Sequence, residues 1–185
     1  TFNVAPCVYN GFKQEPRVEL KDGEKVIPEG EYTVVYSNNT DAGNGTVTIQ
    51  DVAGGNYVVS GSTTFPIEQD RIDESRIRVE AHVFNELAKT YEIDLQTILD
   101  HILLEQYKDG GYGTVTYYHD AYGEVAFADY YDIGTAKIEN GKLILPIKNA
   151  SGVESGYDIG TLTIRVDSTN YKSFDLIIHI VARNK

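Results

Sequence analysis

Hydrophobic and polar residues alternate with a period of two along several short stretches of the chain. The alternation covers residues 32–36 (Tyr-Thr-Val-Val-Tyr), residues 46–49 (Thr-Val-Thr-Ile) and residues 77–83. Successive side chains of a β-strand point to opposite faces, so this period predicts strands with one buried face and one solvent-facing face. In the third stretch the outward-facing residues are Arg78, Glu80 and His82.

Asn-Gly pairs separate many of these stretches. They occur at residues 10–11, 44–45 and 140–141. Both residues of such a pair tolerate the positive φ angles that a two-residue hairpin turn requires. The pairs therefore predict three tight turns and a mainly β protein.

One segment has a helical period instead. Its apolar residues recur at intervals of three and four, Asp94 stands before them as a candidate N-cap, and Asp109-Gly110-Gly111 follows them. This spacing predicts a short amphipathic α-helix over residues 95–107, packed on a sheet. A helix that docks into a partner's groove is the alternative. The apolar stripe comprises Leu95, Ile98, Leu99, Ile102 and Leu103.

The chain contains an internal repeat. Residues 45–49 (Gly-Thr-Val-Thr-Ile) precede Asn56-Tyr57, and residues 160–164 (Gly-Thr-Leu-Thr-Ile) precede Asn170-Tyr171. Each copy leads into a β-rich run. The repeat predicts two related modules, over residues 1–68 and 69–185, which meet in a polar connector at residues 68–75.

The charge balance excludes several classes of partner. The 185 residues include 16 Lys and Arg against 28 Asp and Glu, a net charge of −12. Nucleic-acid binding depends on basic side chains that neutralise phosphates, and anionic lipid attracts the same kind of surface. No stretch reaches the roughly 20 apolar residues that span a bilayer. We therefore expect no nucleic-acid partner and no membrane insertion. Because the chain starts at Thr1, we interpret it as a piece of a longer protein.

No motif for catalysis or metal binding is present. Cys7 is the sole cysteine, and the four histidines have neither the i, i+4 spacing nor the HExxH pattern of zinc sites. We therefore expect no cofactor, no transition metal and no enzymatic activity. Acidic residues at the predicted connector leave calcium binding as a minority alternative, weighed against a solvated acidic surface. Those residues are Asp70, Asp73 and Glu74, and the histidines are His82, His101, His119 and His179.

Tyrosine is the one compositional excess, with 14 residues. Several tyrosines crowd one stretch of the second module, where exposed rings would offer a stacking surface for sugars. The alternative is that tyrosine simply suits strands and sheet edges. The candidate carbohydrate-binding residues are Tyr118, Tyr122 and Tyr130.

Motifs throughout the chain resemble those of the immunoglobulin-like repeat modules in large cell-surface proteins of Gram-positive bacteria. In the first module they are Tyr9-Asn10-Gly11, residues 28–39, residues 46–49, Asn56-Tyr57 and residues 64–67. In the second they are residues 89–95, 113–117, 138–143 and 168–174. The resemblance implies two immunoglobulin-like β-sandwich modules in tandem on an extracellular, bacterial surface or secreted protein, and it transfers no functional residue.

Together these observations predict a non-catalytic module that acts as a spacer or in adhesion. Its partners would be neighbouring modules of the same longer chain and a host or cell-wall glycan or protein. The alternative is a carbohydrate-binding accessory module of a secreted glycan-active enzyme. Exposed tyrosine rings would favour the alternative, and buried rings would favour the spacer.

Overall fold

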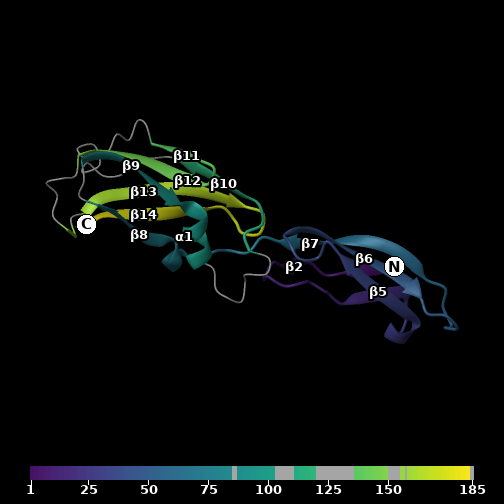
Figure 1. Ribbon diagram of the computed structural model, residues 1–185. Coiled ribbons are helices and arrows are strands. Elements are labelled where there is room, and N and C mark those ends of the chain that lie inside the picture. The colour runs from purple at the N-terminus through teal and green to yellow at the C-terminus, as the bar shows by residue number, and fades with distance from the viewer. Residues whose placement is uncertain (85–86, 103–110, 120–135, 150–154, 157, 184–185) are drawn as a thin grey trace. The chain divides into compact units, whose positions relative to one another are not determined.

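The computed structural model describes residues 1–84, 87–102, 111–119, 136–149, 155–156 and 158–183. The chain divides into two compact units, both built mainly from β-strands (Figure 1). Unit 1 comprises Thr1–Arg71, Glu105–Thr114 and Thr169–Lys172. Unit 2 comprises Ile72–Leu104, Val115–Ser168 and Ser173–Lys185.

Unit 1 contains two small sheets. A four-stranded sheet has the order β2 (Cys7–Val8), β7 (Ser60–Glu68), β6 (Gly43–Asp51) and β5 (Tyr32–Ser37). A three-stranded sheet has the order β1 (Phe2–Val4), β3 (Val18–Asp22) and β4 (Lys25–Val26). A 3-10 turn, η1 (Glu29–Glu31), leads into β5.

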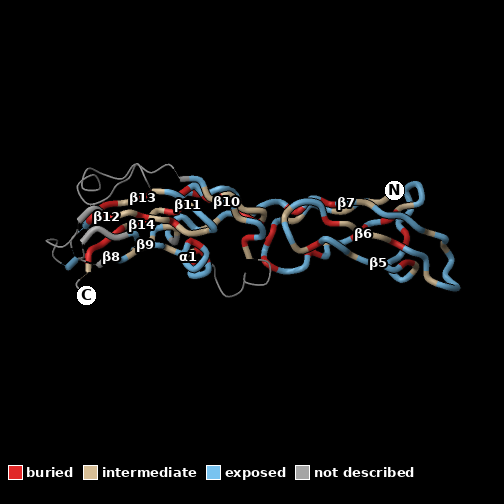
Figure 2. The backbone as a smooth tube through the Cα atoms, turned by 45° about the horizontal axis from the view of Figure 1, so that its top comes forward, coloured by how far each residue is buried: buried red, intermediate tan, exposed pale blue. Residues whose placement is uncertain are grey.

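The predicted alternation is confirmed in unit 1. Val47 and Ile49 of β6 are buried, while Thr46 and Thr48, which alternate with them, are partly exposed. Figure 2 shows buried, intermediate and exposed segments along the backbone of unit 1. The buried side of β5 lies against the three-stranded sheet. The two are joined by a hydrogen bond in which the hydroxyl of Tyr32 in β5 donates to the carbonyl oxygen of Val18 in β3 at 3.3 Å. Apolar burial of this kind is the main source of stability in such a small unit.

One predicted turn is wrong. Asn44 and Gly45 lie inside strand β6, where Gly45 pairs with Phe65 of β7. A Cβ atom on Gly45 would lie 2.7 Å from Cε1 of the fully buried Phe65 ring. Glycine is required here by close packing, so the Asn-Gly pair does not mark a hairpin. The pair Asn140-Gly141 does form a hairpin turn, which joins strands β11 and β12. The φ angles of the two residues are 51° and 74°.

Unit 2 contains a four-stranded and a three-stranded sheet. The first has the order β10 (Val115–His119), β13 (Asp158–Ser168), β14 (Phe174–Arg183) and β8 (Arg78–Phe84). Only β14 and β8 run parallel in it. The second has the order β11 (Lys137–Glu139), β12 (Lys142–Asn149) and β9 (Leu87–Asp94). A 3-10 turn, η2 (Glu74–Arg76), precedes β8.

The predicted helix is confirmed as α1 (Leu95–Ile102), and the rest of the predicted range lies outside the described residues. Asp94 caps it, since its carboxylate accepts the backbone N–H of Thr97 at 3.0 Å. Leu95, Leu99 and Ile102 are buried. The described part of the apolar stripe is therefore core rather than a free docking surface, and Leu103 lies outside the described residues. No described helix is long and apolar enough to cross a bilayer.

Two distant segments complete unit 1. Tyr171 packs edge-on against Tyr9, with ring centroids 5.4 Å apart, and lies 5.5 Å from Tyr112. The neighbouring Asn170 is fully buried, and its side chain donates to Asp41 at 2.9 Å and to the carbonyl oxygen of Gly111 at 3.2 Å. Its own Oδ1 accepts the backbone N–H of residue 42 at 2.8 Å. Unit 1 thus depends on residues more than 100 positions apart.

Candidate functional site

The outer side of the β10-β13-β14-β8 sheet carries a continuous array of polar side chains, here called the polar face. Strand pairing arranges the side chains of the polar face in rows across the sheet. In one row His179 of β14 lies between Thr161 of β13 and Glu80 of β8. In the next row Ile177 of β14 lies between Thr163 of β13 and Arg78 of β8. The polar face comprises Arg78, Glu80 and His82 of β8, Asp175, Ile177, His179 and Arg183 of β14, Asp158, Thr161, Thr163, Arg165 and Asp167 of β13, and Tyr118 of β10.

A shallow depression of about 410 Å³ lies in the middle of the polar face. This volume is within the range of small-molecule sites, which extends from roughly 300 to 1,000 Å³. The depression is open, so a bound group would remain partly solvated. Its lining residues are Arg78, Val79, Glu80, Thr161, Ile177 and His179.

Glu80 is held in an ionic cluster beside the depression. Its Oε1 lies 2.5 Å from Nε2 of His82 and 3.0 Å from Nη2 of Arg183. The hydrogen bond with His82 lowers the pKa of Glu80, and the positive charges of His82, Arg183 and His179 lower it further. Glu80 is therefore ionised at neutral pH and its charge is already compensated.

The remaining ionic groups of the polar face differ in their pairing. His179 is oriented by Asp158, with Nε2 and Oδ1 2.8 Å apart. Arg165 pairs with Asp175 at 3.3 Å. Arg78 is exposed and makes no ion pair with any residue that the structure describes. Arg78 thus offers an uncommitted guanidinium at the rim of the depression.

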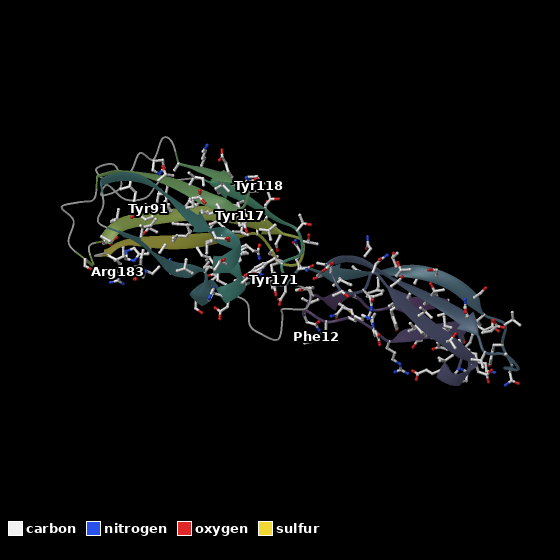
Figure 3. The ribbon with its side chains drawn as sticks, in the orientation of Figure 1. Phe12, Tyr91, Tyr117, Tyr118, Tyr171 and Arg183 are labelled. Carbon is white, nitrogen blue, oxygen red and sulfur yellow. The ribbon has the colours of Figure 1, made fainter. Side chains whose placement is uncertain are left out.

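The structure describes one of the three candidate carbohydrate-binding tyrosines. Tyr118 is 50% exposed and faces outward from β10 opposite Arg165, whereas its neighbour Tyr117 is half-buried (Figure 3). Burial raises the pKa of Tyr117. Tyr122 and Tyr130 lie outside the described residues. Tyr118 shares its sheet face with the depression.

No metal centre is formed by the residues that the structure describes. Among them, no three His, Cys, Asp or Glu side chains come together in a way that would hold an ion. At the predicted connector, Asp70 accepts the backbone N–H of Arg71 at 2.8 Å, and Asp73 accepts that of Ser75 at 2.9 Å. These carboxylates stabilise local turns.

Sequence reasoning identified one strand of the polar face but missed the depression. The alternation at residues 77–83 predicts that Arg78, Glu80 and His82 face solvent, as they do. It does not predict that β8 pairs in parallel with β14, about 100 residues later, which brings His179 beside Glu80. Periodicity describes the faces of one strand and carries no information about its neighbour.

No protein-family model matches this chain, and no curated protein is significantly similar to it. Solved structures give weak overall superpositions. Human mucin-like protocadherin EC1-2 is 11% identical with a TM-score of 0.33, the match covering 100% of this chain and 98% of that one. Sidekick-1 immunoglobulin domains 1–4 are 11% identical with a TM-score of 0.32, covering 100% of this chain and 47% of theirs.

A third similar structure is the Bacteroides ovatus mixed-linkage glucan utilization locus SGBP-B, in complex with a mixed-linkage heptasaccharide. It is 10% identical with a TM-score of 0.21, and the match covers 96% of this chain and 43% of that one. TM-scores this low do not assign the chain to any of these families. The site therefore has to be interpreted from its own residues.

Proposed function

We propose that this chain is a non-catalytic module of an extracellular bacterial surface protein and that it acts in adhesion through the polar face. The observation that carries the proposal is the depression of about 410 Å³ in an open sheet face, beside Arg78, which has no ion pair among the described residues. Fixed polar side chains next to a concave surface are typical of ligand recognition.

The state of the ionisable groups favours binding over catalysis. A general acid at neutral pH needs a raised carboxyl pKa, but the pKa of Glu80 is lowered. His179 is oriented by Asp158, yet the depression lacks a serine or cysteine nucleophile. These groups are arranged to hold a ligand by hydrogen bonds and charge.

The spacer role belongs to the same proposal. In a longer surface protein, two immunoglobulin-like modules over residues 1–68 and 69–185 would separate neighbouring modules and also present the polar face. This organisation, the surface location and the Gram-positive source rest on the sequence motifs.

A second candidate function is that of a carbohydrate-binding module attached to a secreted glycan-active enzyme. The exposed ring of Tyr118 favours it, since an amphipathic aromatic ring offers an apolar stacking surface and a polar edge. Both candidates use the polar face. They differ in the protein to which the chain is attached.

Binding of the purified chain to arrays of cell-wall glycans, host glycans and host matrix proteins tests the proposal. Thr161→Met places a longer, uncharged side chain in the depression and should abolish binding. Thr48→Met is the matched control, because Thr48 lies on the outer side of a strand of unit 1 and is similarly half-exposed. Equal loss in both variants, or no ligand for the parent chain, would contradict the adhesion role.

The tyrosine surface has its own test. A Tyr118→Ala, Tyr122→Ala, Tyr130→Ala triple variant should lose glycan binding while its stability is unchanged. Phe12→Ala is the control, because Phe12 is 51% exposed, much as Tyr118 is, but belongs to unit 1. Full glycan binding by the triple variant would exclude the tyrosines from the site.

A further inference from the structure

We infer that the depression beside Arg78 binds the carboxylate of an acidic saccharide, with the sugar ring lying over Ile177. The inference rests on the proposed function of the polar face and names the chemistry of its ligand. It depends on three features: an available cation, further hydrogen-bonding groups beside it, and an apolar floor.

Arg78 is the available cation. Its guanidinium has planar, fork-like donors that match the two oxygens of a carboxylate. The nearest acidic residue of the lining, Glu80, is already bound by His82 and Arg183. An incoming carboxylate would therefore meet one uncommitted positive charge rather than an existing ion pair.

His179 and Thr161 provide the further polar groups. Nε2 of His179 is engaged by Asp158, which leaves Nδ1 as the ring's remaining polar atom. The hydroxyl of Thr161, directly opposite His179 in the strand pairing, can donate or accept. Hydroxyl groups of a sugar ring are both donors and acceptors, so they can satisfy both side chains.

Ile177 gives the depression an apolar floor. It lies between Arg78 and Thr163 in the strand register and is partly exposed. The side chain of Val79 belongs to the opposite face of β8, where Val79 pairs with the buried Ile178. The C–H face of a sugar ring can cover this apolar surface while its carboxylate reaches Arg78, which removes apolar area from water.

The local charge also favours an anion. The chain as a whole has a net charge of −12, but charges farther away than the Debye length of about 8 Å are largely screened at physiological salt. Around the depression, Glu80 contacts Arg183, Asp158 contacts His179 and Asp175 contacts Arg165, so Arg78 is the cation there that has no ion pair among the described residues. An anionic ligand therefore meets one uncompensated positive charge at short range, despite the acidic chain.

The wider face favours a saccharide over an acidic peptide. Tyr118 of β10 pairs with Arg165 of β13, which pairs with Asp175 of β14, two residues before Ile177. Ideal strand spacings then put the Cα atoms of Tyr118 and Ile177 about 12 Å apart. A second ring of an oligosaccharide can stack on Tyr118 while the first occupies the depression. A peptide of glutamates has no ring for either position.

Calorimetric titration of the full chain with trigalacturonic acid and with sialyllactose tests the inference. At least one of these acidic probes should bind. The methyl ester of that probe keeps the ring but removes the charge, so it should bind about tenfold more weakly or worse. Failure of both acidic probes, or equal binding of acid and ester, would overturn the inference.

Variants separate this inference from the adhesion proposal. Arg78→Gln should weaken acidic-probe binding by about tenfold or more and leave the unfolding midpoint unchanged. Arg17→Gln removes another exposed arginine, which belongs to unit 1 and pairs with Glu29, and should leave binding unchanged. A neutral glycan that binds the parent chain, fails to bind Thr161→Met and still binds Arg78→Gln would show that the polar face is an adhesive site. The carboxylate assignment would then be wrong. Equal or tighter binding of a triglutamate peptide would also overturn it.

Discussion

The hydroxyl of Tyr9 donates a hydrogen bond to the carbonyl oxygen of Gly111 at 2.8 Å, across 102 positions of the sequence. Tyr9 is almost fully buried, and its ring packs edge-on against Tyr171. Burial raises the pKa of Tyr9 to about 12, helped by the negative charge of Asp41 and opposed by a hydrogen bond with Asn170. The phenol is thus held in its neutral form.

This pKa shift predicts a loss of stability at alkaline pH. An unfolded tyrosine titrates near 10, so between about pH 10 and 12 the unfolded state loses its proton while the folded state keeps it. The contribution of Tyr9 is therefore complete below pH 10 and declines as pH rises through this window. Urea denaturation at several pH values should show a shallower alkaline decline in Tyr9→Phe than in the parent chain. Identical slopes would contradict the assignment.

Asn170 should be one of the most sensitive polar positions. Its buried amide is bonded to Asp41, Gly111 and the backbone of residue 42. Asn170→Ala leaves these groups without partners and should lower the free energy of unfolding by about 2 to 4 kcal/mol. Asn56, the corresponding residue of the repeat, is exposed and bonds Glu31. Asn56→Ala should cost less than about 1 kcal/mol, and similar losses in the two variants would show that Asn170 is not a structural centre.

Gly45→Ala tests the packing of strand β6 against Phe65. The new methyl group would overlap the buried ring, and overpacking of this kind typically costs about 1 to 3 kcal/mol. Gly61→Ala is the control, because a Cβ atom there meets nothing within 4 Å. Chemical denaturation should separate the two variants. An unchanged midpoint for Gly45→Ala would mean that Phe65 can move aside.

Leu99→Ala tests the core role of helix α1. Leu99 is fully buried, so its truncation should lower the free energy of unfolding by about 2 to 5 kcal/mol. Gln96→Ala, on the exposed side of the same helix, should change it by about 0.5 kcal/mol or less. If both variants unfold with the parent chain, the apolar stripe is not part of the core.

Glu80→Gln should change the acid side of the stability profile. The folded pKa of Glu80 lies below its ordinary value of 4.5, so its stabilising contribution is present above pH 4.5 and is lost as pH falls through the folded pKa. The variant should therefore lose less stability than the parent chain below pH 4.5. Glu24→Gln is the control, since Glu24 is exposed and makes no ion pair within the described residues. Parallel acid profiles for Glu80→Gln and the parent would contradict the cluster with His82 and Arg183.

The elements that local patterns specify could be predicted from the sequence. Alternation gave the faces of the strands around Val47 and Arg78, and the helical period together with Asp94 located helix α1. These features depend on residues only a few positions apart in the sequence. The mainly β composition follows from them.

Features that depend on distant packing could not be predicted. The Asn44-Gly45 pair predicts a turn, whereas the physical reason for Gly45, close contact with the ring of Phe65, lies on another strand. The two repeat copies look alike in sequence, yet Asn56 is exposed and Asn170 is fully buried. The depression requires β8 and β14 to be neighbours, which no local signal encodes.

The late position of Tyr171 and Asn170 has a consequence for biosynthesis. Chains generally begin to fold from the N-terminus while they are still being translated. Residues 1–71 leave the ribosome before the aromatic partner of Tyr9 and the amide that bonds Asp41, which are made only after the intervening residues 72–168. Until residues 169–172 have been synthesised, the core of the first unit is therefore incomplete. In this period the nascent unit is accessible to chaperones and proteases.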